Sequence, residues 1–578
     1  MYLRLLLVVV VMLSFGCAHV SNDKAVLPND MAKSQQLDEQ KNDVTVDEKI
    51  EPSQLDSALL YSLLGGEIAG QRGKVEMASA FYVDAAERSR DPQIALRAAQ
   101  IALYNKDIVA AKSAIDILLE DGRLSAQAYR LALTIYLRSG DVPKSLAQID
   151  YLLEETSIPK RNALLSVGDI VRRNASKAVA VEVMEHLIVD YPEESGVYLA
   201  HSQIMAHVGE LESALNSARK AVEIGPLWAT GYVQLALVLE NKGDSEQALA
   251  TLKESSERLQ AKQLVMGYGQ LLAKHEHYLE AKEQFLNLAT SEKDYPEARF
   301  ALGLVYLKLN DAKNSKEVFE NLHKEGRFPS KAAFYLGRIN YHQKEYKEAL
   351  KWFSEVDRGV NYVESQANMA MIKSETNDLQ GARSILQTLR LDSPKSATRF
   401  YLLEAELLMN GQHNKEAYLL LTKAVEESPA DLALRYTRSI AATEVDDIAM
   451  AEKDLLHVLQ ATPKDANALN ALGYTLASKT FRFKEARQYL TEALSLRPND
   501  SAILDSMGWL NYREGKYEKA LILLEKAYDI TPGGEIAAHL GEVLWVLGRQ
   551  KEAKVVWEQA LKRDADNRYL IEVLLRLK

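Results

Sequence analysis

Cysteine is almost absent from this chain of 578 residues, in which Cys17 is the only one. A single thiol excludes an intramolecular disulfide and a zinc site built on cysteines. Long apolar runs are also lacking, because nothing beyond the first residues approaches the roughly 20 apolar residues of a membrane-spanning helix. Positive charge is in deficit too. The formal net charge of −11 argues against nucleic acid or an anionic lipid surface as the main partner.

The first residues have the pattern of a secretory signal peptide. Arg4 precedes an apolar run over residues 5–13, which is about half the length of a membrane span. We therefore predict a signal peptide over residues 1–16. Gly16-Cys17 resembles the end of a bacterial lipobox, although Ser14 stands where Leu is usual and Phe15 is bulkier than the usual Ala or Ser. The resemblance implies lipidation of Cys17. The alternative is a small buried apolar residue.

A polar segment follows Cys17. Residues 18–54 are rich in Asp, Glu, Lys, Gln, Ser and Asn, with almost no aromatic or large apolar side chains. Such a composition cannot bury enough surface to fold, so residues 17–54 are predicted to be a lipidated cysteine and a disordered acidic tether. The tether would span roughly 30–35 Å. Ala18 rather than Asp follows the cysteine, so we expect an anchor in the outer membrane, facing the periplasm.

The remainder of the chain repeats with a period of about 34 residues. Five prolines, at 394, 429, 463, 498 and 532, are separated by 35, 34, 35 and 34 residues. One unit reads Leu336-Gly337 and then Ala349-x-x-x-Phe353, which matches the tetratricopeptide (TPR) pattern of a helix-turn-helix unit. The small residues suit the crossing of two helices, and the proline ends the second helix. Gly-Asp and Gly-Lys pairs, such as those at 140, 243 and 515, suit the turn between the helices.

This period predicts an all-α fold, a TPR α-solenoid that winds as a right-handed superhelix. About 15 windows fit between residues 56 and 567. The windows over residues 55–192 are degenerate, and those over 193–567 form the TPR array. Residues 568–578 are predicted to be a final helix that covers the last repeat, as the ends of solenoids require.

Catalytic groups are not brought together by any motif. His275, Glu276 and His277 form the most metal-like cluster, but they fall in a turn, and residues i and i+2 of a helix do not share a face. A Gly-rich phosphate loop and a nucleophile elbow are both absent. The sequence therefore predicts a protein that is not an enzyme, with no metal, no cofactor and no small-molecule substrate.

TPR arrays offer a concave groove lined by the first helix of each unit, and this groove is the predicted partner-binding site. Aromatic side chains at the groove positions are typical anchors of protein interfaces. The alternative is that some of them contact a neighbouring helix. A Lys/Asn clamp for a terminal carboxylate is missing, so we expect a folded or helical partner. The predicted binding residues are Phe334, Tyr341, Tyr436, Tyr474, Trp509, Tyr512 and Trp545.

Three segments, residues 470–477, 505–513 and 539–545, resemble the large TPR lipoproteins of gammaproteobacteria, the family of LbcA-like adaptors. The resemblance is specific over about residues 465–565. It implies an outer-membrane adaptor that binds a periplasmic carboxyl-terminal processing protease with a PDZ domain. Such an adaptor presents cell-wall hydrolases to the protease and has no catalytic residues of its own. The alternative is a pilotin-like assembly factor for a secretion, pilus or polysaccharide-export apparatus.

Overall fold

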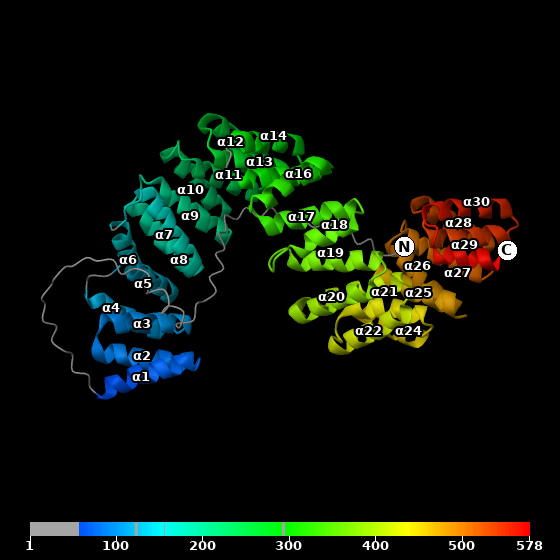
Figure 1. Ribbon diagram of the computed structural model, residues 1–578, viewed down its shortest axis with the longest axis horizontal. Helices are drawn as coiled ribbons and strands as arrows, with labels where there is room; N and C mark the ends of the chain where they lie inside the picture. Colours follow the sequence, from blue (N-terminus) through cyan, green and yellow to red (C-terminus); the bar gives the residue numbers. More distant parts are fainter. Residues whose placement is uncertain (1–56, 122–124, 155, 292–294, 578) are drawn as a thin grey trace. The chain divides into compact units, whose positions relative to one another are not determined.

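The computed structural model describes residues 57–121, 125–154, 156–291 and 295–577. Across these ranges the regular structure is helical and contains no strand, which confirms the predicted all-α fold (Figure 1). The predictions for residues 1–16 and 17–54, including Cys17, lie outside the described residues. In the part searched, no helix combines the length and apolar character that crossing a membrane requires.

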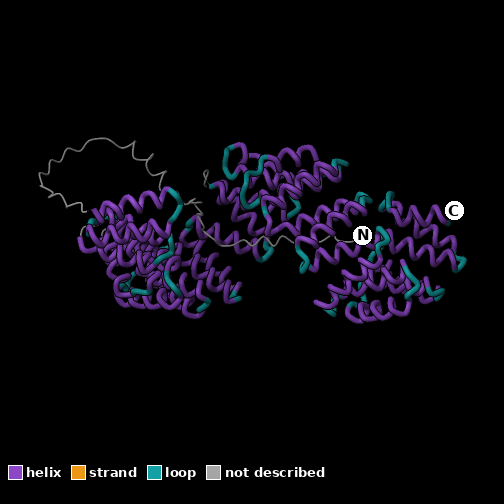
Figure 2. Tube along the Cα trace, turned by 90° about the horizontal axis from the view of Figure 1, so that it is seen from below, coloured by secondary structure: helices purple, strands orange, loops and turns teal. Residues whose placement is uncertain are grey.

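The helices form two compact units, which divide between Asp311 and Ala312. Short loops join the helices within each unit (Figure 2). The first unit also has a short 3-10 helix, η2 (Leu119–Asp121). Its α-helices are α1 (Ser57–Gln71), α2 (Val75–Ser89), α3 (Pro92–Tyr104), α4 (Ile108–Leu118), α5 (Ala126–Ser139), α6 (Val142–Glu154), α7 (Lys160–Asn174), α8 (Lys177–Asp190), α9 (Ser195–Val208), α10 (Leu211–Ile224), α11 (Ala229–Lys242), α12 (Ser245–Leu259), α13 (Lys262–Lys274), α14 (Tyr278–Ser291) and α15 (Pro296–Lys308).

The second unit continues the same alternation of helix and turn. It includes the 3-10 helix η3 (Pro394–Ser396). Its α-helices are α16 (Ala312–Lys324), α17 (Pro329–His342), α18 (Tyr346–Ser354), α19 (Tyr362–Glu375), α20 (Leu379–Asp392), α21 (Ala397–Asn410), α22 (Asn414–Glu427), α23 (Leu432–Glu444), α24 (Ile448–Ala461), α25 (Ala466–Lys479), α26 (Phe483–Leu496), α27 (Ser501–Arg513), α28 (Tyr517–Ile530), α29 (Gly534–Val546), α30 (Gln550–Arg563) and α31 (Arg568–Arg576).

Consecutive helices pair as hairpins, and a residue in the left-handed region closes the turn of many of them. Glycine takes this place where the sequence predicts it: φ is 77° at Gly140, 91° at Gly243 and 78° at Gly515. In other hairpins a residue with a side chain stands there, such as Lys344 with φ 60° and Gln412 with φ 62°. These residues carry the conformational cost that glycine avoids.

Small residues lie where the two helices of a hairpin cross. A Cβ added to Gly508 of α27 would stand 2.7 Å from Leu524 of α28. A Cβ on Gly541 of α29 would overlap the indole of Trp557 of α30. The close approach that the repeat pattern predicts is therefore present, and it depends on the absence of a side chain at these positions.

A proline followed by an aspartate two residues later marks the junction between hairpins. Helix α26 ends at Leu496 just before Pro498, because proline lacks the N–H that continues a helix. The Asp500 carboxylate then accepts hydrogen bonds from the backbone N–H groups of Ala502 and Ile503, at 3.0 and 3.4 Å. It thereby caps the first turn of α27.

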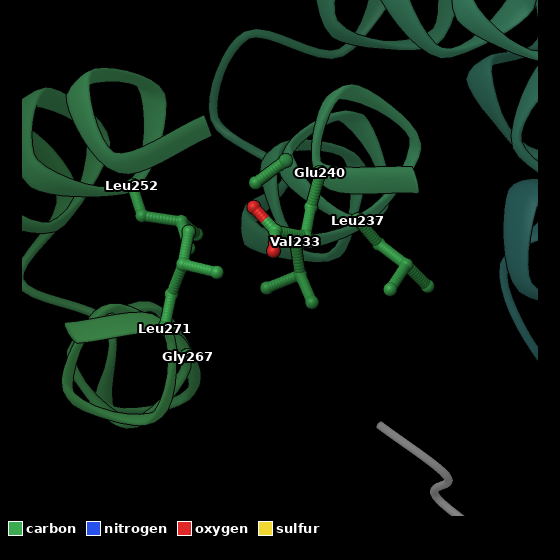
Figure 3. A pocket seen from close by; sticks show the side chains of 7 residues that line it. Val233, Leu237, Glu240, Leu252, Gly267 and Leu271 are labelled. Atoms are coloured by element: carbon green, nitrogen blue, oxygen red, sulfur yellow. The ribbon is translucent and has the colours of Figure 1, made fainter. Parts of the chain in front are cut away.

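A small void lies between α11, α12 and α13 (Figure 3). Its volume is about 10 Å³. A space of this size holds one water molecule at most, so the void is a packing gap and not a ligand site. It is lined by Val233, Ala236, Leu237, Glu240, Leu252, Gly267 and Leu271.

Candidate partner-binding site

The first helices of the last hairpins face one another across a concave surface. The hydroxyl of Tyr474 in α25 donates a hydrogen bond of 3.0 Å to Glu535 in α29, and so bypasses α27. Helices two hairpins apart can touch only if they line the inside of the curve. We call this surface the inner face, defined by Tyr474, Asp505, Trp509, Tyr512, Glu535, His539 and Glu542.

Trp509 and His539 form the centre of the inner face. Their rings stack with centroids 4.1 Å apart and planes inclined by 21°. Tyr512 stacks on Trp509 with centroids 4.9 Å apart, and the Tyr474 ring lies 6.3 Å from that of His539. Three of the predicted binding residues, Tyr474, Trp509 and Tyr512, are thus brought together, and each of them is half-buried.

Glu542 joins the aromatic centre to the final helix. Its side chain is almost fully buried, with 3% of the residue surface exposed. It accepts a hydrogen bond of 2.7 Å from the Tyr512 hydroxyl and one of 2.5 Å from the Arg576 guanidinium of α31. Burial raises the pKa of Tyr512, and the negative charge of Glu542 raises it further. Tyr512 is therefore a neutral donor across the physiological range.

Carboxylates give the inner face an acidic character. Asp505 lies 2.9 Å from Nδ1 of the buried His539, and Glu535 and Glu542 add to the local negative potential. Burial disfavours the charged imidazolium and by itself lowers the pKa of His539. The effect of these carboxylates is larger and raises that pKa above its usual value. Burial also raises the pKa of Glu535. The site thus favours cationic groups.

One polar atom beside the inner face has no partner. Asn470 stands one helical turn before Tyr474 on α25, so the two residues share a face. It is 8% exposed, and its Oδ1 accepts no hydrogen bond within the described residues. A buried acceptor without a partner is costly to the folded protein.

Two of the predicted binding residues pack inside their own hairpins. Trp545 stacks on Trp557 of α30 with centroids 5.8 Å apart, and Lys554 lies over its ring. Phe334 in α17 is 6% exposed and packs with Phe353 of α18. These are the helix contacts that the sequence left open as the alternative.

The other two predicted residues lie in earlier hairpins of the second unit and are half-buried. The Tyr341 hydroxyl donates a hydrogen bond of 2.8 Å to Glu375, so it links α17 to α19. Tyr436 in α23 packs against the core, and burial together with Asp465 raises its pKa to about 12. Neither residue contacts the aromatic centre through a hydrogen bond or ring contact seen in the structure.

The cluster at His275, Glu276 and His277 forms the turn between α13 and α14. Glu276 closes this turn with φ 64°, and Nε2 of His275 lies 3.0 Å from Glu240. His275 is thus hydrogen-bonded to its neighbouring hairpin. In the described ranges, no group of three or more His, Cys, Asp or Glu side chains is placed to hold a metal ion.

Sequence reasoning did not single out His539, Glu535, Glu444 or Arg568 as binding residues. His539 could have been found, because Asp505 and His539 are 34 residues apart and so occupy equivalent places one repeat apart. The contact of Arg568 with Glu444 joins residues 124 positions apart. No period in the sequence signals that contact.

An array of helical hairpins with an aromatic and charged inner face defines the class of helical-repeat proteins that bind other proteins. The chain belongs to the tetratricopeptide-repeat family. Tetratricopeptide repeat models match residues 229–258, 300–362 and 476–535. The TPR repeat-containing protein PA4667 of Pseudomonas aeruginosa is 32% identical over 512 residues, which cover 86% of this chain and 85% of that protein. The solenoid prediction is thereby confirmed, and this fold is typically a non-catalytic scaffold for protein interactions.

More distant similarities extend to other TPR proteins. Tetratricopeptide repeat protein 21B of Xenopus laevis is 24% identical over 286 residues, which cover 43% of this chain and 22% of that protein. The crystal structure of yeast Tom70 aligns with 78% of this chain and 94% of its own, at 15% identity and a TM-score of 0.35.

Proposed function

We propose that this protein is a lipid-anchored scaffold of the outer membrane that binds a periplasmic carboxyl-terminal processing protease and presents cell-wall hydrolases to it. The observation that carries the proposal is the inner face, where stacked aromatic rings and buried carboxylates converge from three hairpins. Stacked Trp and Tyr side chains are the usual anchors of a protein interface.

Three further features support the proposal. The lipobox-like end at Cys17 and the acidic segment after it suit a body held close to a membrane. The segments that resemble LbcA-like adaptors contribute Tyr474, Trp509, Tyr512 and His539 to the inner face. A scaffold that holds both protease and substrate raises their effective concentration and needs no catalytic group of its own.

The experiment is a crosslinked pull-down from membranes with three forms of the full chain. Wild type should recover a PDZ-containing serine protease. Trp509→Ala should reduce its recovery at least tenfold, because loss of a central aromatic anchor costs about 2 kcal/mol or more. Trp352→Ala is the matched control, because this half-buried tryptophan of α18 packs beside His323 and lies on no part of the inner face.

The outcomes separate the proposal from its alternative. Recovery of no protease by wild type would refute the adaptor role, and recovery of a secretin or export channel instead would favour an assembly factor. Equal recovery by Trp509→Ala and wild type would refute the role of the inner face. Cys17→Ser should release the folded protein from the membrane fraction, and retention there would refute the lipid anchor.

A further inference from the structure

The last helix does not simply continue the stack of hairpins. Helix α31 packs mainly against α29, the first helix of the preceding hairpin, and only marginally against α30. Its first residue, Arg568, donates two hydrogen bonds to the carboxylate of Glu444, at 2.6 and 2.8 Å. Glu444 ends α23, which belongs to the fourth hairpin before α31. Helix α31 is therefore drawn towards the inside of the curve.

The other end of α31 is held in the same way. Arg576 donates its hydrogen bond to Glu542, which is also the acceptor of Tyr512 on the inner face. Between the two arginines, Leu570 and Val573 are buried against the core of the last hairpin. Eight residues separate the arginines, which is about 12 Å along a helix. Helix α31 thus presents a basic group at each end and an apolar stripe between them.

This arrangement shows which ligand chemistry the inner face accepts. Without α31, the buried Glu542 and the half-buried Glu444 would lose their cationic partners, and an uncompensated buried charge is strongly destabilising. The apolar surface of α29 would be exposed as well. A helix that only caps a solenoid needs the Leu570 and Val573 contacts. It does not need a bidentate ion pair with a helix four hairpins earlier in the chain.

We propose that the inner face together with Glu444 is a docking surface for an amphipathic helix with a basic side chain at each end, that α31 is its resident occupant, and that a partner helix of this chemistry takes the place of α31. This inference rests on the proposed scaffold function and specifies the partner: a helix of nine residues or more with a basic residue at each end. Glu535, which accepts the hydrogen bond of Tyr474, adds a further carboxylate to the inner face.

The test uses the full chain and a labelled peptide of residues 565–578, followed by fluorescence anisotropy. The variant Arg568→Glu/Arg576→Glu sets two carboxylates against Glu444 and Glu542 and should expel α31. The peptide should bind this variant at least tenfold more tightly than wild type. Arg549→Glu is the matched control, because Arg549 pairs with Glu552 at the start of α30 and not with the inner face. It should behave as wild type.

Two further measurements test the inference: binding of a peptide with a reversed charge, and amide hydrogen exchange of the protein. A peptide with Arg568→Glu should bind poorly to the double variant, because its carboxylate would lie against that of Glu444. Amides of α31 should exchange faster in the double variant, while those of α27 and α29 stay protected.

Three results would overturn the inference: an α31 that stays protected in the double variant, a released α31 whose place the peptide does not take, or equal peptide binding by wild type. None of these results affects the protease pull-down, so the proposed function is tested separately.

Discussion

His539 shows how one side chain depends on carboxylates from other hairpins. Its ring is 6% exposed and lies between Trp509 and Asp505. Burial alone would lower the pKa of this imidazole, yet the surrounding carboxylates reverse the direction of the shift. The imidazolium therefore helps to hold the acidic inner face together in the folded protein.

This shift predicts a pH-dependent stability. Because the folded pKa of His539 is raised, its stabilising effect is fully present below the unfolded value of about 6.5. The effect is lost as the pH rises through the folded value. The difference in Tm between wild type and His539→Gln should therefore narrow from pH 6 to pH 9. A difference that stays constant or widens would contradict the raised pKa.

At the scale of the element, many of the hairpin turns share one backbone conformation. The closing residue of such a turn has a positive φ whether it is Gly243, at 91°, or Lys344, at 60°. The backbone geometry is thus set by the hairpin, and the residue type adjusts only the cost of adopting it. A side chain in this region costs roughly 1–2 kcal/mol, of which glycine avoids the greater part.

Exchanging the turn residues should change stability in opposite directions. Lys344→Gly should raise the free energy of unfolding by a few tenths of a kcal/mol up to about 1 kcal/mol, because relief of the strained φ exceeds the greater entropy loss of glycine. Gly243→Ala should lower it by about 1 kcal/mol. Denaturant titration of each variant measures both changes. A loss of stability in Lys344→Gly would show that its side chain makes a contact worth more than the strain.

At the scale of the whole molecule, local sequence patterns determine the repeat, whereas the candidate site depends on the curvature of several hairpins together. Period, turn glycines and helix-ending prolines act within one hairpin, so the all-α solenoid could be predicted from the sequence. The sequence could not decide whether the side chains of Trp545 and Phe334 lie on the inner face or inside their hairpins. Neighbouring positions of a helix differ by about 100° in direction, so an error of one residue in the register changes the face. The Arg568–Glu444 contact depends on the curvature of several hairpins together.

Contacts between distant hairpins should couple their unfolding. Tyr474→Phe removes the hydrogen bond to Glu535 and should cost about 1.5–3 kcal/mol, the usual range for a bond to a charged group. In this variant the backbone amides of α25 should also open to hydrogen exchange independently of those of α29. Tyr528→Phe is the control, because the buried Tyr528 hydroxyl has no partner among the described residues and its removal should be neutral or stabilising. Equal effects of the two variants would contradict this coupling.

The pairs Tyr474–Glu535 and Arg568–Glu444 have a mechanical consequence. A repeat array in which each unit touches only its neighbours stretches like a spring, one unit after another. The last hairpins here are also linked to one another at a distance, because Arg568 of α31 bonds Glu444 of α23 and so closes a clasp around them. Under tension this end should resist extension up to a threshold force and then yield in one step. A partner helix that displaces α31 would open the clasp and make the end of the protein compliant.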